Sequence, residues 1–277
     1  MKAIKINNFS KKYGSLQAIN NINIEVEKGT IFGFVGKNGA GKSTTIRTML
    51  NMIFPTAGTI EILGLDCVKD SEAIKSKISY LPSEINYYDS LKVEEILKFT
   101  CDFMKCNYQK AKELADYFEL DVKRKISQLS LGNKKKVSIV LTLCRDSELY
   151  ILDEPTNGLD PLMQQKFFDL IIKEKQKGKT VFLSSHNLSE VEKYCDVVAI
   201  IKDGKIVEQL TMSEVLKNHK KIITYTLKDN SKHRVEFDNN YQKLLTDLLK
   251  MDIIDLEIKN QSIEDDFINY YQRGDYE

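Results

Sequence analysis

Apolar residues alternate with polar ones near the start of the chain and then gather into short unbroken runs. Ile22, Ile24 and Val26 alternate with polar residues, which predicts a strand with one buried face. The run TIFGFV at residues 30–35 predicts a strand that is buried on both faces. Further buried strands are expected at 149–152, 180–183 and 197–201. These runs indicate a core sheet of short strands.

Helical spacing dominates the stretches between these runs. Apolar residues recur at helical intervals from Ile46 to Ile53, and the same spacing predicts three helices between about 85 and 147. Strands that alternate with helices favour an α/β fold with a mostly parallel core sheet. The helices of 85–147 are then an inserted helical subdomain, and the alternating strands near the start form an antiparallel β subdomain.

The pattern changes again towards the end of the chain. Asp203-Gly204 predicts the turn of a hairpin that closes the core sheet. Residues 222–227 predict a strand, 227–237 a hairpin and 241–251 a helix. The expected domains are therefore 1–215, which contains the helical insertion, and a small α+β appendage at 216–277.

Length and composition limit the function classes. The chain has 277 residues, of which 42% are hydrophobic, and its formal net charge of +1 lacks the basic footprint of a nucleic-acid-binding protein. No apolar run approaches the ~18 residues that cross a bilayer, and the N-terminus lacks the apolar core of a signal peptide. We expect a chain kept inside the cell, with no membrane span of its own and no nucleic-acid partner.

The cysteines show no metal-binding or redox spacing along the chain. None forms a CxxC pair or stands near a histidine at ligand spacing. Reduced and mostly buried thiols are expected at Cys67, Cys101, Cys106, Cys144 and Cys195.

A glycine-rich segment, GKNGAGKST at 36–44, stands between the strand of 30–35 and a helix. It matches G-x-x-x-x-G-K-[ST] in the setting that this phosphate-binding motif requires. Backbone N–H groups of such a loop converge on an anion at a helix N-terminus. Lys42 is placed to reach the β- and γ-phosphates and Ser43 to bind Mg²⁺. The nucleotide-binding residues expected here are Gly36, Asn38, Gly39, Ala40, Gly41, Lys42, Ser43 and Thr44.

Two acids, Asp153 and Glu154, end the apolar strand at 149–152. Adjacent like charges oppose burial, so something positive is expected beside them. In a nucleotide-binding fold, an acid at the end of a second core strand holds Mg²⁺ opposite the phosphates. We expect Asp153 to bind the metal, through water, and Glu154 to polarise the water that attacks the γ-phosphate. A helix N-cap is the alternative role for Asp153.

These motifs resemble those of the ATP-binding cassette (ABC) ATPases over residues 1–215, and LSLGN at 129–133 is similar to that family's signature LSGGQ. The resemblance implies a P-loop NTPase of the ABC type. It also implies that Ser130 and Gly132 contact the γ-phosphate of ATP held by a second cassette. A plain helix cap is the alternative for Ser130.

Three further positions match the family. Tyr13 resembles the aromatic residue that stacks on adenine, although an isolated tyrosine could instead pack in a core. Asp160 in NGLD resembles the D-loop between cassettes, and His186 resembles the switch histidine that touches the γ-phosphate. The resemblance thus implies Lys42, Glu154 and His186 as catalytic residues, with ATP and Mg²⁺ as cofactors.

One loop departs from the family pattern. The glutamine usual after a Y-h-P stretch (h, hydrophobic) is Ser83 here, followed by Glu84. A serine is too short to link metal or attacking water easily to a membrane partner, so either Glu84, or Ser83 through a water, could take its place. Leu131 and Asn133 also depart from the signature, but Ser130 and Gly132 remain.

The resemblance implies a head-to-tail dimer of cassettes, either two copies or a pair with a paralogue, that drives a separate transmembrane permease. The chain would then be a peripheral protein on the cytoplasmic face of the membrane. The insertion after Pro82 is the expected docking groove for a permease helix. Its candidate residues are Tyr87, Tyr88, Leu91 and Phe99, although each of them singly could instead pack in the core of the insertion. The motif set and IEDDFINYY at 263–271 most resemble bacterial cassettes that export drugs, bacteriocins or peptides.

Two other functions fit the sequence less well. A soluble ABC ATPase of translation normally carries two cassettes in one chain, and one of DNA maintenance inserts a long coiled coil. This chain has room for one cassette and no sustained heptads between Ser43 and Asp153. A GTPase switch is disfavoured because the chain contains no NKxD-type guanine motif.

Overall fold

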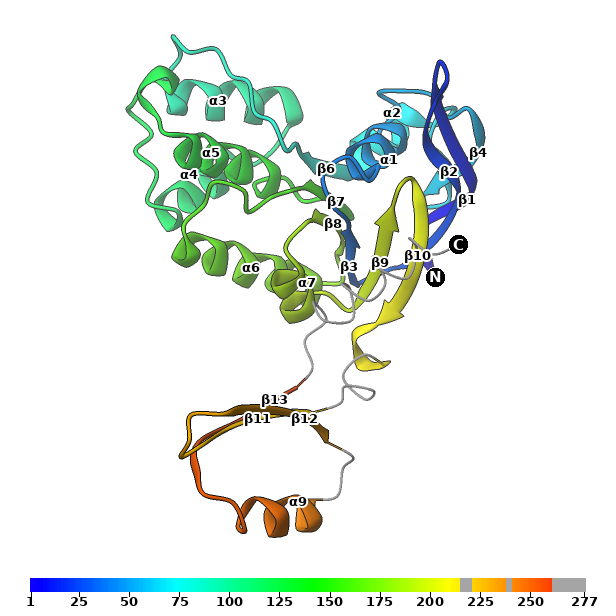
Figure 1. The fold of residues 1–277 in the computed structure, drawn as a ribbon. Helices are drawn as coiled ribbons and strands as arrows, with labels where there is room; N and C mark the ends of the chain where they lie inside the picture. The colour runs from blue at the N-terminus through cyan, green and yellow to red at the C-terminus, as the bar shows by residue number, and fades with distance from the viewer. Residues whose placement is uncertain (215–220, 238–240, 261–277) are drawn as a thin grey trace. The chain divides into compact units, whose positions relative to one another are not determined.

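The computed structural model describes residues 1–214, 221–237 and 241–260. The chain divides into two compact units, Met1–Gln209 and Leu210–Glu277, and each is described by itself (Figure 1). The segment IEDDFINYY, which carried part of the resemblance to exporters, lies outside the described residues.

A six-stranded sheet forms the centre of the first unit. Its order is β10-β9-β3-β8-β7-β6, and the register of β9, β3, β8, β7 and β6 is parallel. The strands are β3 (Ile31–Val35), β6 (Ile78–Leu81), β7 (Leu149–Asp153), β8 (Thr180–Ser185), β9 (Val197–Lys202) and β10 (Lys205–Thr211). All residues of β3, β7 and β8 are buried, as their continuous apolar runs predict. The predicted turn at Asp203-Gly204 joins β9 to β10.

A second, antiparallel sheet covers this centre with the order β2-β1-β4-β5. Its strands are β1 (Lys2–Tyr13), β2 (Leu16–Glu27), β4 (Ala57–Ile62) and β5 (Leu65–Asp66). Ile22, Ile24 and Val26 of β2 are buried while their neighbours are exposed, so the alternation in the sequence marks the face of this sheet that joins the core.

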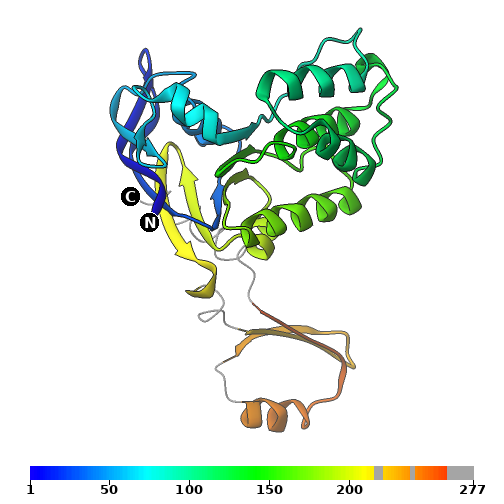
Figure 2. The same cartoon turned by 180° about the vertical axis from the view of Figure 1, so that it is seen from behind.

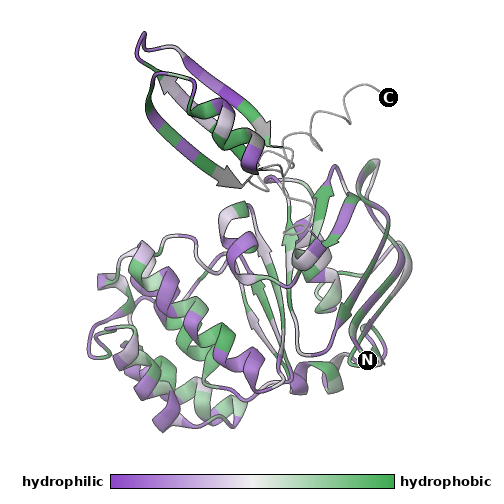
Figure 3. Cartoon of the chain, turned by 90° about the horizontal axis from the view of Figure 1, so that it is seen from below, coloured by the Kyte–Doolittle hydropathy of each residue, from purple (hydrophilic) through white to green (hydrophobic). Residues whose placement is uncertain are grey.

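Helices cover the six-stranded sheet on both faces. They are α1 (Lys42–Met49), α2 (Ser71–Lys77), α6 (Pro161–Gln176) and α7 (Leu188–Tyr194). Phe32 and Phe34 of β3 point into the core shared with α1, whereas Gly33 between them lies against α7. Figure 2 shows the same arrangement from behind. Figure 3 colours the same fold by hydropathy, and the helices carry both hydrophobic and hydrophilic residues.

The predicted helical subdomain is a separate group of helices beside β6 and β7 (Figure 1). It contains α3 (Val93–Met104), α4 (Tyr108–Tyr117), the short 3₁₀ helix η1 (Ile126–Gln128) and α5 (Leu131–Leu143). Helices α3, α4 and α5 contact one another, and α5 also contacts β6. Helix α5 therefore connects this subdomain to the central sheet.

The second unit contains an antiparallel sheet of three strands in the order β12-β11-β13. Its elements are β11 (Lys221–Leu227), β12 (Lys232–Phe237), α9 (Tyr241–Leu248) and β13 (Ile253–Asn260). The predicted strand at 222–227 corresponds to β11, and the predicted helix at 241–251 corresponds to α9. The hairpin predicted within 227–237 instead consists of the turn after β11 and the strand β12, which pairs with β11. Strand β13 was not predicted, although Ile254, Leu256 and Ile258 alternate with Asp255 and Glu257. Among the described residues, no helix has both the length and the apolar character needed to span a membrane.

Three phenylalanine rings in contact at the centre of the first unit allow the core packing to be tested. Phe182 of β8 stacks on Phe32 with ring centroids 5.5 Å apart and also contacts Phe34 at 5.5 Å. We expect Phe182→Ala to lower the free energy of unfolding by about 3–5 kcal/mol because it leaves a cavity. The matched control Phe99→Ala removes a ring that is 73% exposed and should cost less than about 0.5 kcal/mol. Urea unfolding measures both variants, and equal losses would contradict this account of the core.

Candidate functional site

The loop between β3 and α1 carries the predicted phosphate-binding motif. Lys42, the first residue of α1, is buried, and its ammonium group donates hydrogen bonds to Gly36 O at 2.6 Å and to Lys37 O at 3.3 Å. Gly41 has a φ of 112°, and a Cβ there would lie 2.4 Å from Ile19 Cδ1. Position 41 therefore requires glycine, and the tight loop curls around the amine of its own lysine.

A cleft of about 400 Å³ opens over this loop, a size in the ordinary range of ligand sites. Its polar lining combines the loop with residues from β2 and from the segments that follow β6 and β7. The lining residues are Ala18, Lys37, Asn38, Gly39, Gly41, Lys42, Ser43, Thr44, Ser83, Glu84, Glu154 and Asn157. Of the predicted loop residues, Gly36 and Ala40 lie beneath this surface: Gly36 N–H donates to Ser185 O, and Ala40 O accepts from Gly204 N–H.

Asp153 lies at the end of β7, directly beside Ser184 of β8 in the parallel register. It is only 1% exposed, and its Oδ1 accepts a hydrogen bond of 2.6 Å from Ser184 Oγ. Ser184 Oγ in turn accepts a hydrogen bond of 3.1 Å from the backbone N–H of Glu154. One hydroxyl group therefore fixes both acids, and sequence reasoning missed this serine because nothing in the run VFLSSH distinguishes it from its neighbours.

Glu154 adopts a left-handed backbone with a φ of 49°, which is unfavourable for a residue with a side chain. Its Oε1 lies 3.1 Å from Lys42 Nζ, and its Oε2 lies 2.8 Å from His186 Nδ1. Oε1 is buried and has no partner with hydrogen-bond geometry, so the ion pair with Lys42 is its main stabilisation. Lys42 is thus the positive group beside Glu154, whereas Asp153 is bonded to Ser184.

The lining of the cleft fits the phosphates of a nucleotide with a bound cation. The lining includes two lysines, Lys37 and Lys42, together with hydroxyl oxygens and the carboxylate oxygens of Glu84 and Glu154. Such oxygens are the ligands that Mg²⁺ prefers, while lysines and converging amides suit phosphate.

The signature segment lies outside this cleft, and of the NGLD segment only Asn157 lines it. The two segments meet at Gly132 and Gly158. Ser130 is exposed, and its Oγ caps α5 by accepting from Asn133 N–H at 3.3 Å. Asp160 caps α6 in the same way through Met163 N–H at 3.0 Å. A Cβ at Gly132 would lie 2.6 Å from Gly158 O, so glycine at 132 allows the two segments to pack. The cap that was the alternative role for Ser130 is thus present, whereas the cap by Asp160 was not predicted. Neither residue lines the cleft of its own chain.

Tyr13 lies at the end of β1, next to the turn of the β1–β2 hairpin. Its side chain is 44% exposed, with Lys11 Nζ 4.9 Å from the ring centroid. Ala18 on the other arm of this hairpin lines the cleft. The ring is therefore available to a ligand rather than packed in the core.

Ser83 and Glu84, the residues that stand in place of the family glutamine, both line the cleft. Behind this loop lies Lys135 of α5, which is 2% exposed and donates from Nζ to Pro82 O at 3.1 Å and to Ser83 O at 3.5 Å. Burial lowers the pKa of Lys135 to about 8, although Asp153 and Glu154 oppose this shift. Sequence reasoning missed this residue, because a lysine within the run KKK is usually a solvated one.

Comparisons with known proteins agree with this geometry. The family model described as ABC transporter matches residues 19–157. The bacitracin transport ATP-binding protein BcrA of Bacillus licheniformis is 34% identical over 275 residues, which are 98% of this chain and 87% of that protein. The lantibiotic transport ATP-binding protein SrtF of Streptococcus pyogenes is 34% identical over 206 residues, which are 74% of this chain and 89% of that protein.

Solved structures give the same answer. The structure of an ATP binding subunit of an ABC transporter superposes with a TM-score of 0.71 at 28% identity, over 78% of this chain and 92% of that one. The predicted fold class and family resemblance are therefore confirmed. The chain belongs to the ABC transporter family, whose ATP-binding cassettes bind and hydrolyse ATP.

Proposed function

We propose that this chain powers a separate membrane permease that exports antimicrobial peptides, drugs or similar amphiphiles. The observation that carries the proposal is the carboxylate of Glu154, held between Lys42 and His186 at the phosphate cleft. The names of the relatives, which transport bacitracin and a lantibiotic, support an export substrate of this class.

Glu154, His186 and Lys42 each have a separate role in hydrolysis. Glu154 is the general base that accepts a proton from the attacking water. His186 contacts the other oxygen of this carboxylate, so it orients the base and reaches the γ-phosphate from the same side. Lys42 contacts the β- and γ-phosphates from the loop.

Ser43 and Asp153 would hold Mg²⁺. Ser43 lines the cleft, whereas Asp153 lies behind it and is fixed by Ser184, a position that suits contact through water. When bound, the ion offsets the negative charge of the phosphates.

A second cassette completes the nucleotide site. Ser130, Gly132 and Asp160 lie outside the cleft of their own chain, and Ser130 and Asp160 are exposed. They are therefore available to a nucleotide held by a second copy or a paralogue, while Tyr13 stacks on adenine in its own chain. In this role Ser130 presents the N-terminus of α5 to a phosphate.

Lys135 replaces part of what the missing glutamine does. Its ammonium group ties the Pro82–Ser83 carbonyls to α5, the helix that begins at the signature. The loop is thus fixed to the helical subdomain from behind, while Ser83 and Glu84 face the cleft. We assign Lys135 as a positioning residue for this loop.

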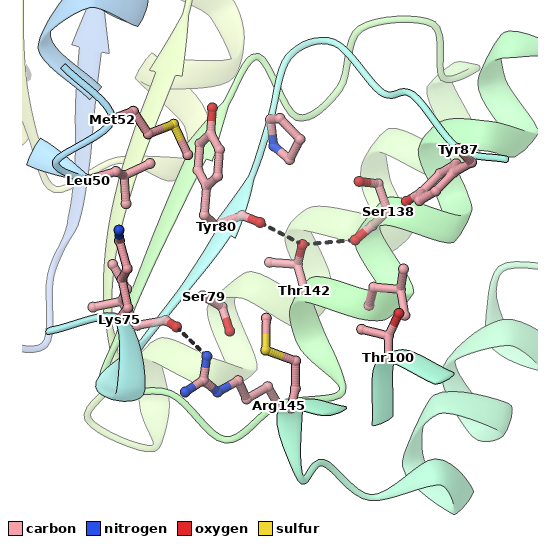
Figure 4. A pocket seen from close by; sticks show the side chains of 14 residues that line it. Leu50, Met52, Lys75, Ser79, Tyr80, Tyr87, Thr100, Ser138, Thr142 and Arg145 are labelled. Atoms are coloured by element: carbon pink, nitrogen blue, oxygen red, sulfur yellow. Dashed lines mark hydrogen bonds between the residues drawn. The ribbon is translucent and has the colours of Figure 1, made fainter. Parts of the chain in front are cut away.

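The permease docks beside this loop. A mostly apolar cavity of about 410 Å³ lies between β6, α3 and α5, with Tyr80, Tyr87, Thr100, Ser138 and Thr142 around it (Figure 4). Met52 and Met104, which are 55% and 46% exposed, stand at its rim and suit an apolar helix. The chain is then peripheral on the cytoplasmic face of the membrane, with residues 216–277 as an accessory unit.

The general base gives the sharpest test of this function. We expect Glu154→Gln to lower ATP turnover by ~10²–10⁴ while ATP still binds, because only proton acceptance is lost. Glu190→Gln is the matched control: that buried carboxylate accepts a hydrogen bond from Thr156 and takes no part in the mechanism. Steady-state phosphate release and nucleotide titration measure both variants. Near wild-type turnover in Glu154→Gln would remove Glu154 from its role.

If Lys135 positions the loop, its replacement should lower ATP turnover without lowering the stability of the fold. Lys135→Met keeps the stem and removes the ammonium group, so ATP turnover should fall about ten- to a hundredfold as the loop shifts. Stability should not fall with it. The pKa of Lys135 is lowered from the usual 10.5 to about 8 in the folded state, because burial disfavours the charged amine. Below pH 8 the amine is charged in the folded chain, so its burial opposes folding there. Wild-type stability should therefore rise relative to the variant as pH increases from about 8 to 10.5. Loss of stability in parallel with turnover at every pH would indicate a merely structural residue.

The docking cavity predicts which variant loses the permease. Tagged wild-type chain, purified from its native membranes in mild detergent, should bring down a stoichiometric multi-span membrane protein. Met104→Glu at the cavity rim should lose that protein and still bind ATP, because a charge opposes apolar docking. Leu162→Glu, at a 58% exposed position on α6 away from the cavity, should keep it. Recovery with ribosomes or DNA would favour the soluble alternative instead.

A further inference from the structure

Three cysteines that are distant in the sequence converge in the helical subdomain. The Sγ atoms of Cys101, Cys106 and Cys144 all lie within 4.8 Å of one another, and Cys106 Sγ is 3.3 Å from Cys144 Sγ. All five cysteines are free thiols, and the other two, Cys67 and Cys195, lie buried outside this group. The fold therefore brings together three cysteines whose spacing along the sequence does not predict a cluster.

The backbone holds the three thiols in place at the ends of two helices, α3 and α5. Cys101 lies in the last turn of α3, and Lys105 then adopts a left-handed φ of 53° that turns the chain back. As a result Cys106 N–H donates to Cys101 O at 3.0 Å. Cys144 is the C-cap residue of α5, where its N–H donates to Val140 O at 2.9 Å. The positions of the three side chains are thus set by helix ends rather than by a flexible loop.

The distances suit a metal ion better than the alternatives. A Zn–S bond of about 2.3 Å in a tetrahedral site places sulfurs about 3.8 Å apart, so the observed 3.3–4.8 Å range needs only small side-chain shifts. A disulfide would require the sulfurs of Cys106 and Cys144 to approach to about 2.05 Å and would leave Cys101 without a role. Ordinary packing of buried thiols explains Cys67 and Cys195 but does not require three sulfurs in mutual contact.

Access to the cluster is from one side. Cys101 and Cys144 are each 2% exposed, whereas Cys106 is partly exposed and gives an ion a path from solvent. Among the described residues, no other cysteine, histidine or carboxylate joins the group, which leaves a fourth position open to water. Three thiolates with an open position select a soft or borderline-soft cation such as Zn²⁺ over Mg²⁺ or Ca²⁺.

We propose that Cys101, Cys106 and Cys144 bind one thiophilic metal ion, of the Zn²⁺ class, in the helical subdomain. The bound ion joins the end of α3 to the end of α5. Helix α5 carries Ser130 at its other end, so the ion stiffens the element that presents the signature. This site is separate from the Mg²⁺ site at Ser43 and Asp153, and its test does not depend on ATP hydrolysis.

The test uses Cd²⁺ as a probe on the full-length chain, kept reduced with a phosphine that does not compete as a thiol. We expect one Cd²⁺ per chain by equilibrium dialysis, the charge-transfer absorption of cadmium–thiolate bonds, displacement by Zn²⁺, and a rise in melting temperature. Cys106→Ser, at the partly exposed position where folding is least affected, should weaken binding at least about tenfold. Cys101→Ser and Cys144→Ser should do the same.

Cys67→Ser and Cys195→Ser are the matched controls and should bind Cd²⁺ like the wild type. Mass spectrometry of each variant without reductant reports whether Cys106 and Cys144 form a disulfide instead. Absence of the charge-transfer band in the folded wild-type chain, binding that survives Cys106→Ser, or a disulfide in place of a bound ion would each overturn the proposal.

Discussion

The nucleotide site depends on the parallel register between β7 and β8. That register places Ser184 opposite Asp153, so one hydroxyl donates to the Asp153 carboxylate and accepts from the Glu154 N–H. These bonds help to hold Glu154 in a left-handed backbone that would otherwise be unfavourable. The same backbone turns the Glu154 side chain towards Lys42 and His186. A shift of one residue in the strand pairing would separate the acids from their lysine, which connects the order of the core strands directly to the chemistry.

The buried ammonium group of Lys135 connects the nucleotide site to the helical subdomain. Lys135 lies behind the loop that follows β6 and donates to two of its carbonyls, while its helix begins at the signature serine. A buried ammonium group is expensive to desolvate, as its lowered pKa shows. Burying Lys135 lowers the stability of the fold, but its hydrogen bonds fix the position of the loop that follows β6. This loop has Ser83 in place of the longer glutamine side chain, so support from Lys135 is useful there.

Much of the first unit could be predicted because its signals are local. The buried strands are continuous apolar runs, and the phosphate loop is a motif with fixed spacing, so Lys42, Asp153 and Glu154 could be named as candidate site residues from the sequence. His186 became a candidate because it follows an apolar strand at the place where the family has its histidine, and it lies beside Glu154 in the structure. What escaped prediction depends on three-dimensional proximity. Ser184 matters because of a neighbouring strand, Lys135 because of a loop far away in the sequence, and the three cysteines because two helix ends meet.

The close approach of Gly132 to Gly158 has a consequence for a pair of cassettes. The signature segment of one chain rests on the segment that follows the Glu154 of the same chain. In the proposed head-to-tail pair, these two segments would serve different nucleotides, since the glutamate would act on one ATP and the signature would contact the other. Any backbone movement around one glutamate would therefore be passed, without an intervening side chain, to the phosphate end of the opposite site. Such a contact would make the two hydrolysis events interdependent, and a side chain at position 132 would be expected to uncouple their timing even if each site could still bind ATP.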